Sequence, residues 1–138
     1  MTTAFTIEQL DGPYAFCRLD PQAPWPVWAS GQFVSISRSD QELSVLCPEA
    51  CVPATLPEGA RCDRGFCVLR IRGTVDIDVV GLLKSLSTAL ADGGISVTVI
   101  GTFDTDYMLI RESRLAVAMQ LLRRAGFDTH GDRLGPPS

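Results

Sequence analysis

The sequence predicts an α+β protein whose C-terminal half follows the element order β-α-β-β-α-β. In two stretches apolar and polar residues alternate with the period of a strand, and in two others leucines recur with the period of a helix. Gly93, Gly94 and Gly126 follow the two helical stretches, where glycine commonly ends a helix. With both helices on one face of the sheet, this order forms a ferredoxin-like sandwich.

The first strand and the first helix of this half are predicted at residues 66–73 and 79–91. The helix carries one continuous apolar stripe, formed by Val79, Leu82, Leu83, Leu86 and Leu90. Asp76 or Asp78 is expected to cap the start of this helix, because an Asp side chain accepts hydrogen bonds from the free N–H groups there. The two elements together predict a helix packed on a half-buried strand.

A second strand at 95–103 and a third at 106–111 are expected to form a hairpin. The second strand has one apolar face, formed by Ile95, Val97, Val99 and Phe103. Asp104 is expected to lie in the turn, since Asp tolerates turn geometry. Asp106 begins the returning strand, where its carboxylate either contacts a ligand or only keeps the strand edge soluble.

A second helix at 112–125 and a short strand at 127–130 complete the C-terminal half. The stripe of this helix consists of Leu115, Ala118, Met119 and Leu122. The helix and the last strand supply the final α-β pair of the predicted order.

The N-terminal half reads as a reduced copy of the same plan. Strands are predicted around 14–19, 32–39 and 41–48, but prolines leave room only for a short helix near Val27 and a stunted helix or loop after Cys47. The predicted organisation is a reduced module at 1–65, a complete module at 66–130 and a disordered tail at 131–138. Modules of this size are marginal alone, so the two are expected to share a buried seam.

Composition argues against several classes of protein. A net charge of −4 removes the attraction that nucleic-acid binding usually needs. The chain has no run of about 18 apolar residues and no secretory signal at its start, so no membrane association and a cytoplasmic location are expected. Catalytic triads, phosphate loops and cofactor motifs are missing from the sequence, which predicts no enzymatic activity and no cofactor.

The five cysteines are an odd number, which argues against a disulfide framework in a chain without a secretory signal. Their spacings, C-x3-C and C-x4-C, also differ from those of common zinc sites, so no metal is expected. The cysteines are predicted to act as small buried hydrophobic residues.

The C-terminal half resembles the ACT domain. In "TVDIDVVGLLKSLSTALADGGISVTVIGTFDTDYMLI", Asp78 precedes a Gly81-Leu82 pair that opens the first helix, and a Gly94-Ile95 step starts the second strand. The segment "FVSISRSDQELSVLCPEACVP", followed by "GTFDTDYMLI", is similar to small bacterial tandem-ACT proteins. These are related to the ACT pair of aspartate kinases and to the CASTOR arginine sensors. The similarity covers most of residues 14–127.

The resemblance implies two ferredoxin-like ACT modules packed side by side, the N-terminal one reduced, in a regulatory homodimer. It implies that a small amino acid binds at the seam between the modules. The ligand-binding residues carried over from the family are Thr74, Val75 and Asp76 in the loop before the first helix, and Thr102, Phe103 and Asp106 at the end of the second strand. An alternative function is structural, with the proline-rich N-terminal half filling the cleft of an interaction protein.

Overall fold

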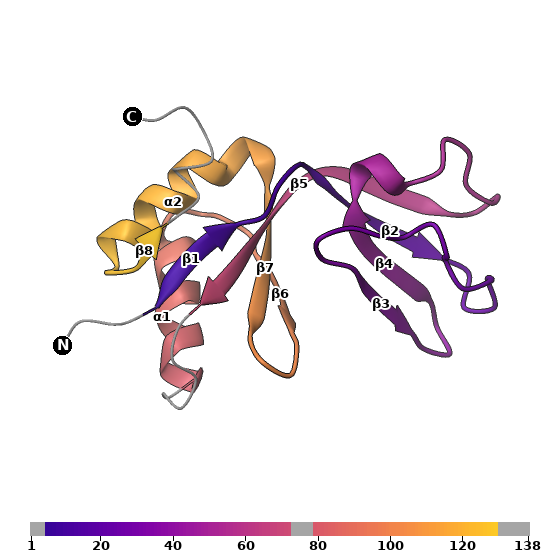
Figure 1. The fold of residues 1–138 in the computed structure, drawn as a ribbon. Helices are drawn as coiled ribbons and strands as arrows, with labels where there is room; N and C mark the ends of the chain where they lie inside the picture. Colours follow the sequence, from indigo (N-terminus) through magenta and orange to yellow (C-terminus); the bar gives the residue numbers. More distant parts are fainter. Residues whose placement is uncertain (1–4, 73–78, 130–138) are drawn as a thin grey trace. The chain divides into compact units, whose positions relative to one another are not determined.

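The computed structural model describes residues 5–72 and 79–129, which form two compact units (Figure 1). The N-terminal unit is Asp11–Phe66. The C-terminal unit combines Met1–Leu10 with Cys67–Ser138. One long strand, β5 (Arg61–Arg72), contributes its first half to the N-terminal unit and its second half to the C-terminal unit.

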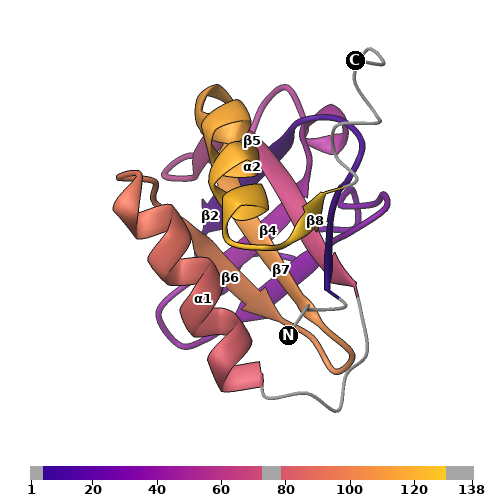
Figure 2. The ribbon, with the colours of Figure 1, turned by 90° about the vertical axis from the view of Figure 1, so that its left-hand side faces the viewer.

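The C-terminal unit has the predicted ferredoxin-like fold. Its strands lie in the order β8-β1-β5-β7-β6, and both helices cover the same face of this sheet (Figure 2). Its elements other than β5 are β1 (Thr6–Gln9), α1 (Val79–Asp92), β6 (Thr98–Gly101), β7 (Asp106–Arg111), the 3-10 helix η2 (Glu112–Arg114), α2 (Leu115–Arg124) and β8 (Asp128–Thr129).

The core of the C-terminal unit confirms the α2 stripe and, from Leu82 onward, the α1 stripe. Leu86 and Leu90 of α1 are buried, with Leu82 and Leu83 packed against them. All four predicted residues of the α2 stripe belong to the same core, namely Leu115, Ala118, Met119 and Leu122. Gly94 follows α1 with a φ of +70°, the conformation expected of a glycine that ends a helix.

The apolar face predicted for strand 95–103 is only partly buried. Ile95 belongs to the core and Val97 packs against it, but Val99 is 41% exposed and Phe103 is fully exposed. The reason is that β6 is shorter than predicted and pairs only with β7 among the described strands. Phe103 therefore lies beyond the strand, in the hairpin loop.

The strand β1 is absent from the sequence-based prediction, which assigned residues 1–65 to the N-terminal module. It pairs antiparallel with β5 and parallel with β8, and its Ile7 is completely buried. Because β1 lies between two strands of the C-terminal unit, the chain up to Leu10 belongs to that unit. The sequence "TIEQ" carries a single large apolar residue, too few for alternation to be recognised.

Glu8 joins β1 to β5 through two arginines. Its carboxylate accepts hydrogen bonds from Arg70 Nε at 2.9 Å and from Arg72 Nη1 at 2.8 Å. Partial burial raises the pKa of Glu8, but these hydrogen bonds and the two positive charges lower it by more, so its pKa lies below the ordinary value. The ionised form is therefore the one that the folded protein favours.

Stability should accordingly depend on the ionisation of Glu8. A lowered pKa gives a contribution that is present above the unfolded-state pKa and is lost as the pH falls through the folded-state pKa. We expect urea unfolding to show Glu8→Gln less stable than wild type at pH 7, with the difference vanishing toward pH 3. The exposed Glu58→Gln serves as the control. If the free energy of unfolding differed between Glu8→Gln and wild type by the same amount at pH 7 and pH 3, this account would be contradicted.

The N-terminal unit has the predicted reduced plan. Its strands are all antiparallel and lie in the order β3-β4-β2-β5, which is the strand order of a ferredoxin-like sheet. The only helix within residues 11–66 is the 3-10 turn η1 (Glu49–Cys51). The remaining strands are β2 (Tyr14–Leu19), β3 (Ser35–Arg38) and β4 (Leu43–Pro48). Prolines in both connections explain why full helices are missing.

None of the helices in the described part of the chain has the length and apolar character needed to cross a membrane.

Candidate functional site

The hairpin between β6 and β7 carries three of the six predicted ligand-binding residues. Thr102 N–H donates to Thr105 O at 2.8 Å, and Thr102 Oγ1 donates to the same oxygen at 3.0 Å. In return, Thr105 N–H donates to Thr102 Oγ1 at 3.3 Å. Thr102 therefore closes the hairpin loop, and most of its hydrogen-bonding capacity is used there.

Phe103 and Asp104 form the tip of this loop, and both are exposed. Asp104 thus lies in the turn, as its sequence context predicts. Asp106 is half-buried and stands opposite Gly101 in the β6–β7 ladder. A Cβ at position 101 would lie 3.2 Å from Asp106 Oδ1, so the glycine leaves room beside this carboxylate.

The hairpin loop is tied to the end of β5. Thr105 Oγ1 donates to Ile71 O, close to the point where β5 ends. The chain then enters residues 73–78, which contain Thr74, Val75 and Asp76. These three predicted site residues lie outside the described residues, as do Asp76 and Asp78 in their predicted role as helix caps. Thr102, Phe103 and Asp106 thus belong to one hairpin, and their relation to residues 74–76 stays a prediction.

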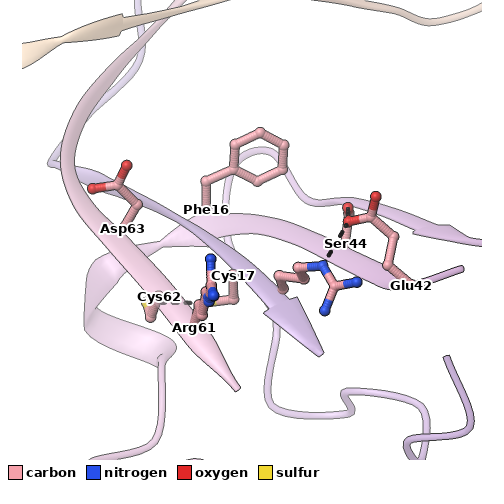
Figure 3. Close-up of a pocket in the computed structure, with 8 residues that line it drawn as sticks. Phe16, Cys17, Glu42, Ser44, Arg61, Cys62 and Asp63 are labelled. Atoms are coloured by element: carbon pink, nitrogen blue, oxygen red, sulfur yellow. Dashed lines mark hydrogen bonds and ion pairs between the residues drawn. The ribbon is translucent and has the colours of Figure 1, made fainter. Parts of the chain in front are cut away.

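A pocket of about 370 Å³ lies within the N-terminal unit, on residues that the sequence analysis did not single out (Figure 3). It is lined by Phe16, Cys17, Arg18, Glu42, Ser44, Arg61, Cys62 and Asp63. Its charged groups have both signs, two arginines and two carboxylates. A pocket of this kind can hold the carboxylate and the ammonium of a zwitterion.

The register of β2 against β5 assembles this pocket. Arg18 stands directly opposite Arg61, and Phe16 stands opposite Asp63. Because side chains alternate along a strand, these four lie on the face away from Cys17 and Cys62. Figure 3 shows Asp63 and Phe16 projecting to one side of the strands and Cys62 to the other.

Arg18 is contacted by two residues just before β4. Its Nε lies 3.8 Å from Glu42 Oε1, and its Nη2 donates to Gln41 O at 3.3 Å. Both side chains of the ion pair are about half exposed, so their attraction is weak. Two arginines opposite one another repel, which makes this face a place where a bound anion would relieve repulsion. In the sequence, the only indication of this charged face was the alternation of charged or aromatic residues with cysteine in "FCR" and "RCD".

Within residues 5–72 and 79–129, no three His, Cys, Asp or Glu side chains are grouped so as to hold a metal ion.

Two family models match the sequence. One, described as an ACT domain, matches residues 61–124, and a model for an N-terminal domain matches residues 12–55. The matches fall largely on the C-terminal and N-terminal units, respectively. No curated protein matches the sequence.

Solved structures extend the comparison over nearly the whole chain. A protein from Agobacterium tumefaciens is 32% identical, with a TM-score of 0.83 and 93% of each chain covered. A Vibrio cholerae protein of unknown function, described as a possible transport protein, is 22% identical, with a TM-score of 0.70, covering 89% of this chain and 91% of that chain. The ligand-free regulatory subunit of aspartate kinase from Thermus thermophilus is 12% identical, with a TM-score of 0.59, covering 91% and 99%. The last two share the fold alone.

Proposed function

Because this chain belongs to the ACT-domain family, as its sequence predicted, we propose that it is a regulatory protein that binds a small amino acid and catalyses no reaction. The match of an ACT-domain model to residues 61–124 carries the proposal. The fold shared with an aspartate kinase regulatory subunit supports the regulatory role. The similarity to CASTOR sensors, the ligand position at a seam between modules and the cytoplasmic location stay predictions.

The proposed site combines the hairpin end with the loop before α1. Asp106 supplies a carboxylate for the ligand's ammonium group, in a charge-assisted hydrogen bond. The loop residues Thr74, Val75 and Asp76 precede a helix, whose free N–H groups suit the ligand's carboxylate. Both halves of a zwitterion would then be paired.

The remaining two members of the proposed site have different roles. Thr102 shapes the loop, because its amide and hydroxyl groups already bond to Thr105. Phe103 is fully exposed, so its ring is free to pack on the apolar part of a ligand. We therefore expect Phe103, and not Thr102, to influence which side chain is preferred.

A thermal-unfolding screen against the amino acids at millimolar concentration tests the proposal. A ligand at about 100 times its Kd stabilises the folded state by about 2.7 kcal/mol. Asp106→Asn should remove this stabilisation, because the neutral amide no longer attracts an ammonium group. Asp104→Asn, an exposed change in the same hairpin loop, should retain it.

Two outcomes would redirect the proposal. If Asp106→Asn still responds to the ligand but Arg61→Gln does not, the amino acid binds in the pocket of the N-terminal unit. If no amino acid stabilises the wild-type protein, ligand binding is wrong and the structural alternative is favoured.

The proposal includes a homodimer. Among the described strands, β6 pairs only with β7, so one edge of β6 has unpaired backbone groups. Val99 on this strand is partly exposed, and an edge strand of this kind readily pairs with another chain. Light scattering after size-exclusion chromatography measures the oligomeric state. A monomer at all protein concentrations would exclude the dimer.

A further inference from the structure

Four of the five cysteines gather in the core of the N-terminal unit. Cys17 comes from β2, Cys47 from β4, Cys51 from η1 and Cys62 from the first half of β5. All of them are free thiols. The fifth, Cys67, belongs to the C-terminal unit.

Two of these thiols are in direct contact. Cys17 and Cys62 stand opposite one another on the antiparallel strands β2 and β5, with their Sγ atoms 2.9 Å apart (Figure 3). Directly opposite residues have Cα atoms about 4.5–5.5 Å apart, which lies inside the range of about 4.4–6.8 Å found in disulfides. A covalent S–S bond of about 2.05 Å needs the sulfurs to approach by less than about 1 Å.

The two thiols differ in their access to solvent. Cys17 is only 2% exposed, whereas Cys62 is partly exposed. Burial raises the pKa of Cys17 to about 12, and its contact with Cys62 acts in the same direction. Because Cys62 is the more accessible of the two thiols, the first reaction with an oxidant falls to Cys62.

We propose that Cys17 and Cys62 form a dithiol site that a hydroperoxide oxidises reversibly to a disulfide. Cys62 Sγ attacks one peroxide oxygen, and an S–O bond forms as the O–O bond breaks. The departing oxygen takes up the thiol proton and leaves as water from hydrogen peroxide, or as an alcohol from an organic hydroperoxide. Cys17 Sγ then attacks the resulting sulfenic sulfur, forming the S–S bond and releasing the second oxygen as water. With hydrogen peroxide, two thiols and one peroxide give one disulfide and two waters.

The other pair in this core is less suited to the reaction. Cys47 is completely buried, and Cys51 Sγ donates to Pro48 O at 3.1 Å. Burial raises the pKa of the Cys47 thiol as well. A disulfide between Cys47 and Cys51 is the product that would compete with the proposed one. Peptide mapping distinguishes the two.

Peptide mapping of the oxidised full-length protein tests the proposal. The reduced protein is treated with one molar equivalent of hydrogen peroxide, blocked with N-ethylmaleimide and digested with trypsin without reduction. Trypsin places Cys17 in peptide 1–18 and Cys62 in peptide 62–64. We expect these two peptides to be joined, with loss of two of the five blockable thiols and their recovery after dithiothreitol.

Matched variants identify the sulfurs that react. Cys62→Ser should lose the joined peptide, whereas Cys51→Ser, a change of the other partly exposed cysteine in the same core, should retain it. An oxidation confined to peptide 39–61, which holds Cys47 and Cys51, would overturn the proposal. So would retention of all five thiols, or a disulfide formed only between two chains. The wild-type map alone decides these outcomes, even if a variant fails to fold.

Discussion

Protein in which the disulfide between Cys17 and Cys62 has formed is expected to resist unfolding of its N-terminal unit by about 4 kcal/mol more than the reduced protein. The two residues are 45 positions apart in the sequence. A crosslink over such a loop restricts the unfolded chain much more than the folded one, where the two sulfurs already touch. The effect is large because the loop encloses most of the N-terminal unit.

Tryptophan fluorescence measures this effect selectively. Both tryptophans of the chain, Trp25 and Trp28, lie in the N-terminal unit. Urea unfolding followed at this signal should move to higher urea after peroxide treatment and return after dithiothreitol. The oxidant should not move the curve of Cys62→Ser. An identical shift in that variant would mean that stabilisation comes from another modification.

Replacement of Ile7 by alanine is expected to destabilise the C-terminal unit by about 2–5 kcal/mol, although the residue lies near the start of the chain. Ile7 is completely buried in a core that includes Leu69, Leu86 and Phe127. Truncation removes apolar contacts and leaves a cavity between β5 and β8, the strands that flank β1. A decrease of this size in the free energy of unfolding is a large part of a small domain's stability.

Circular dichroism at the helical minimum follows the C-terminal unit, because both described α-helices, α1 and α2, belong to it. Urea unfolding of Ile7→Ala should show a lower midpoint than wild type at this signal. Val99→Ala, a β-branched residue that is 41% exposed on β6, should change it little. Equal, small effects of both variants would show that β1 is not part of the stable core.

Local periodicity was sufficient to predict most elements of the C-terminal unit. The strand predicted at 106–111 is β7 with the same bounds, and the helix predicted at 79–91 differs from α1 by one residue. Helical and strand periods depend on neighbours a few positions apart, so a single sequence displays them directly. The position of Asp104 in the turn was also predictable from its immediate neighbours, because Asp tolerates turn geometry.

Candidate sites were predictable to a smaller extent. The resemblance to the ACT family pointed to Thr102, Phe103 and Asp106; these belong to one hairpin, and their role in ligand binding stays a prediction. It did not point to Arg18 and Arg61, which are far apart in the sequence and meet only through the pairing of β2 with β5. A charged residue in an alternating strand shows which face is polar but not which other charge it will oppose.

By itself, the sequence determined the α+β class, the reduction of the N-terminal module by its prolines, and the burial of most cysteines as small apolar residues. Only the tertiary structure decided that β1 joins the C-terminal unit and that Cys17 touches Cys62 rather than another cysteine. The physical reason is that burial follows from the character of each residue and its close neighbours. The choice of partner across a sheet depends instead on the register of strands that are distant in the chain.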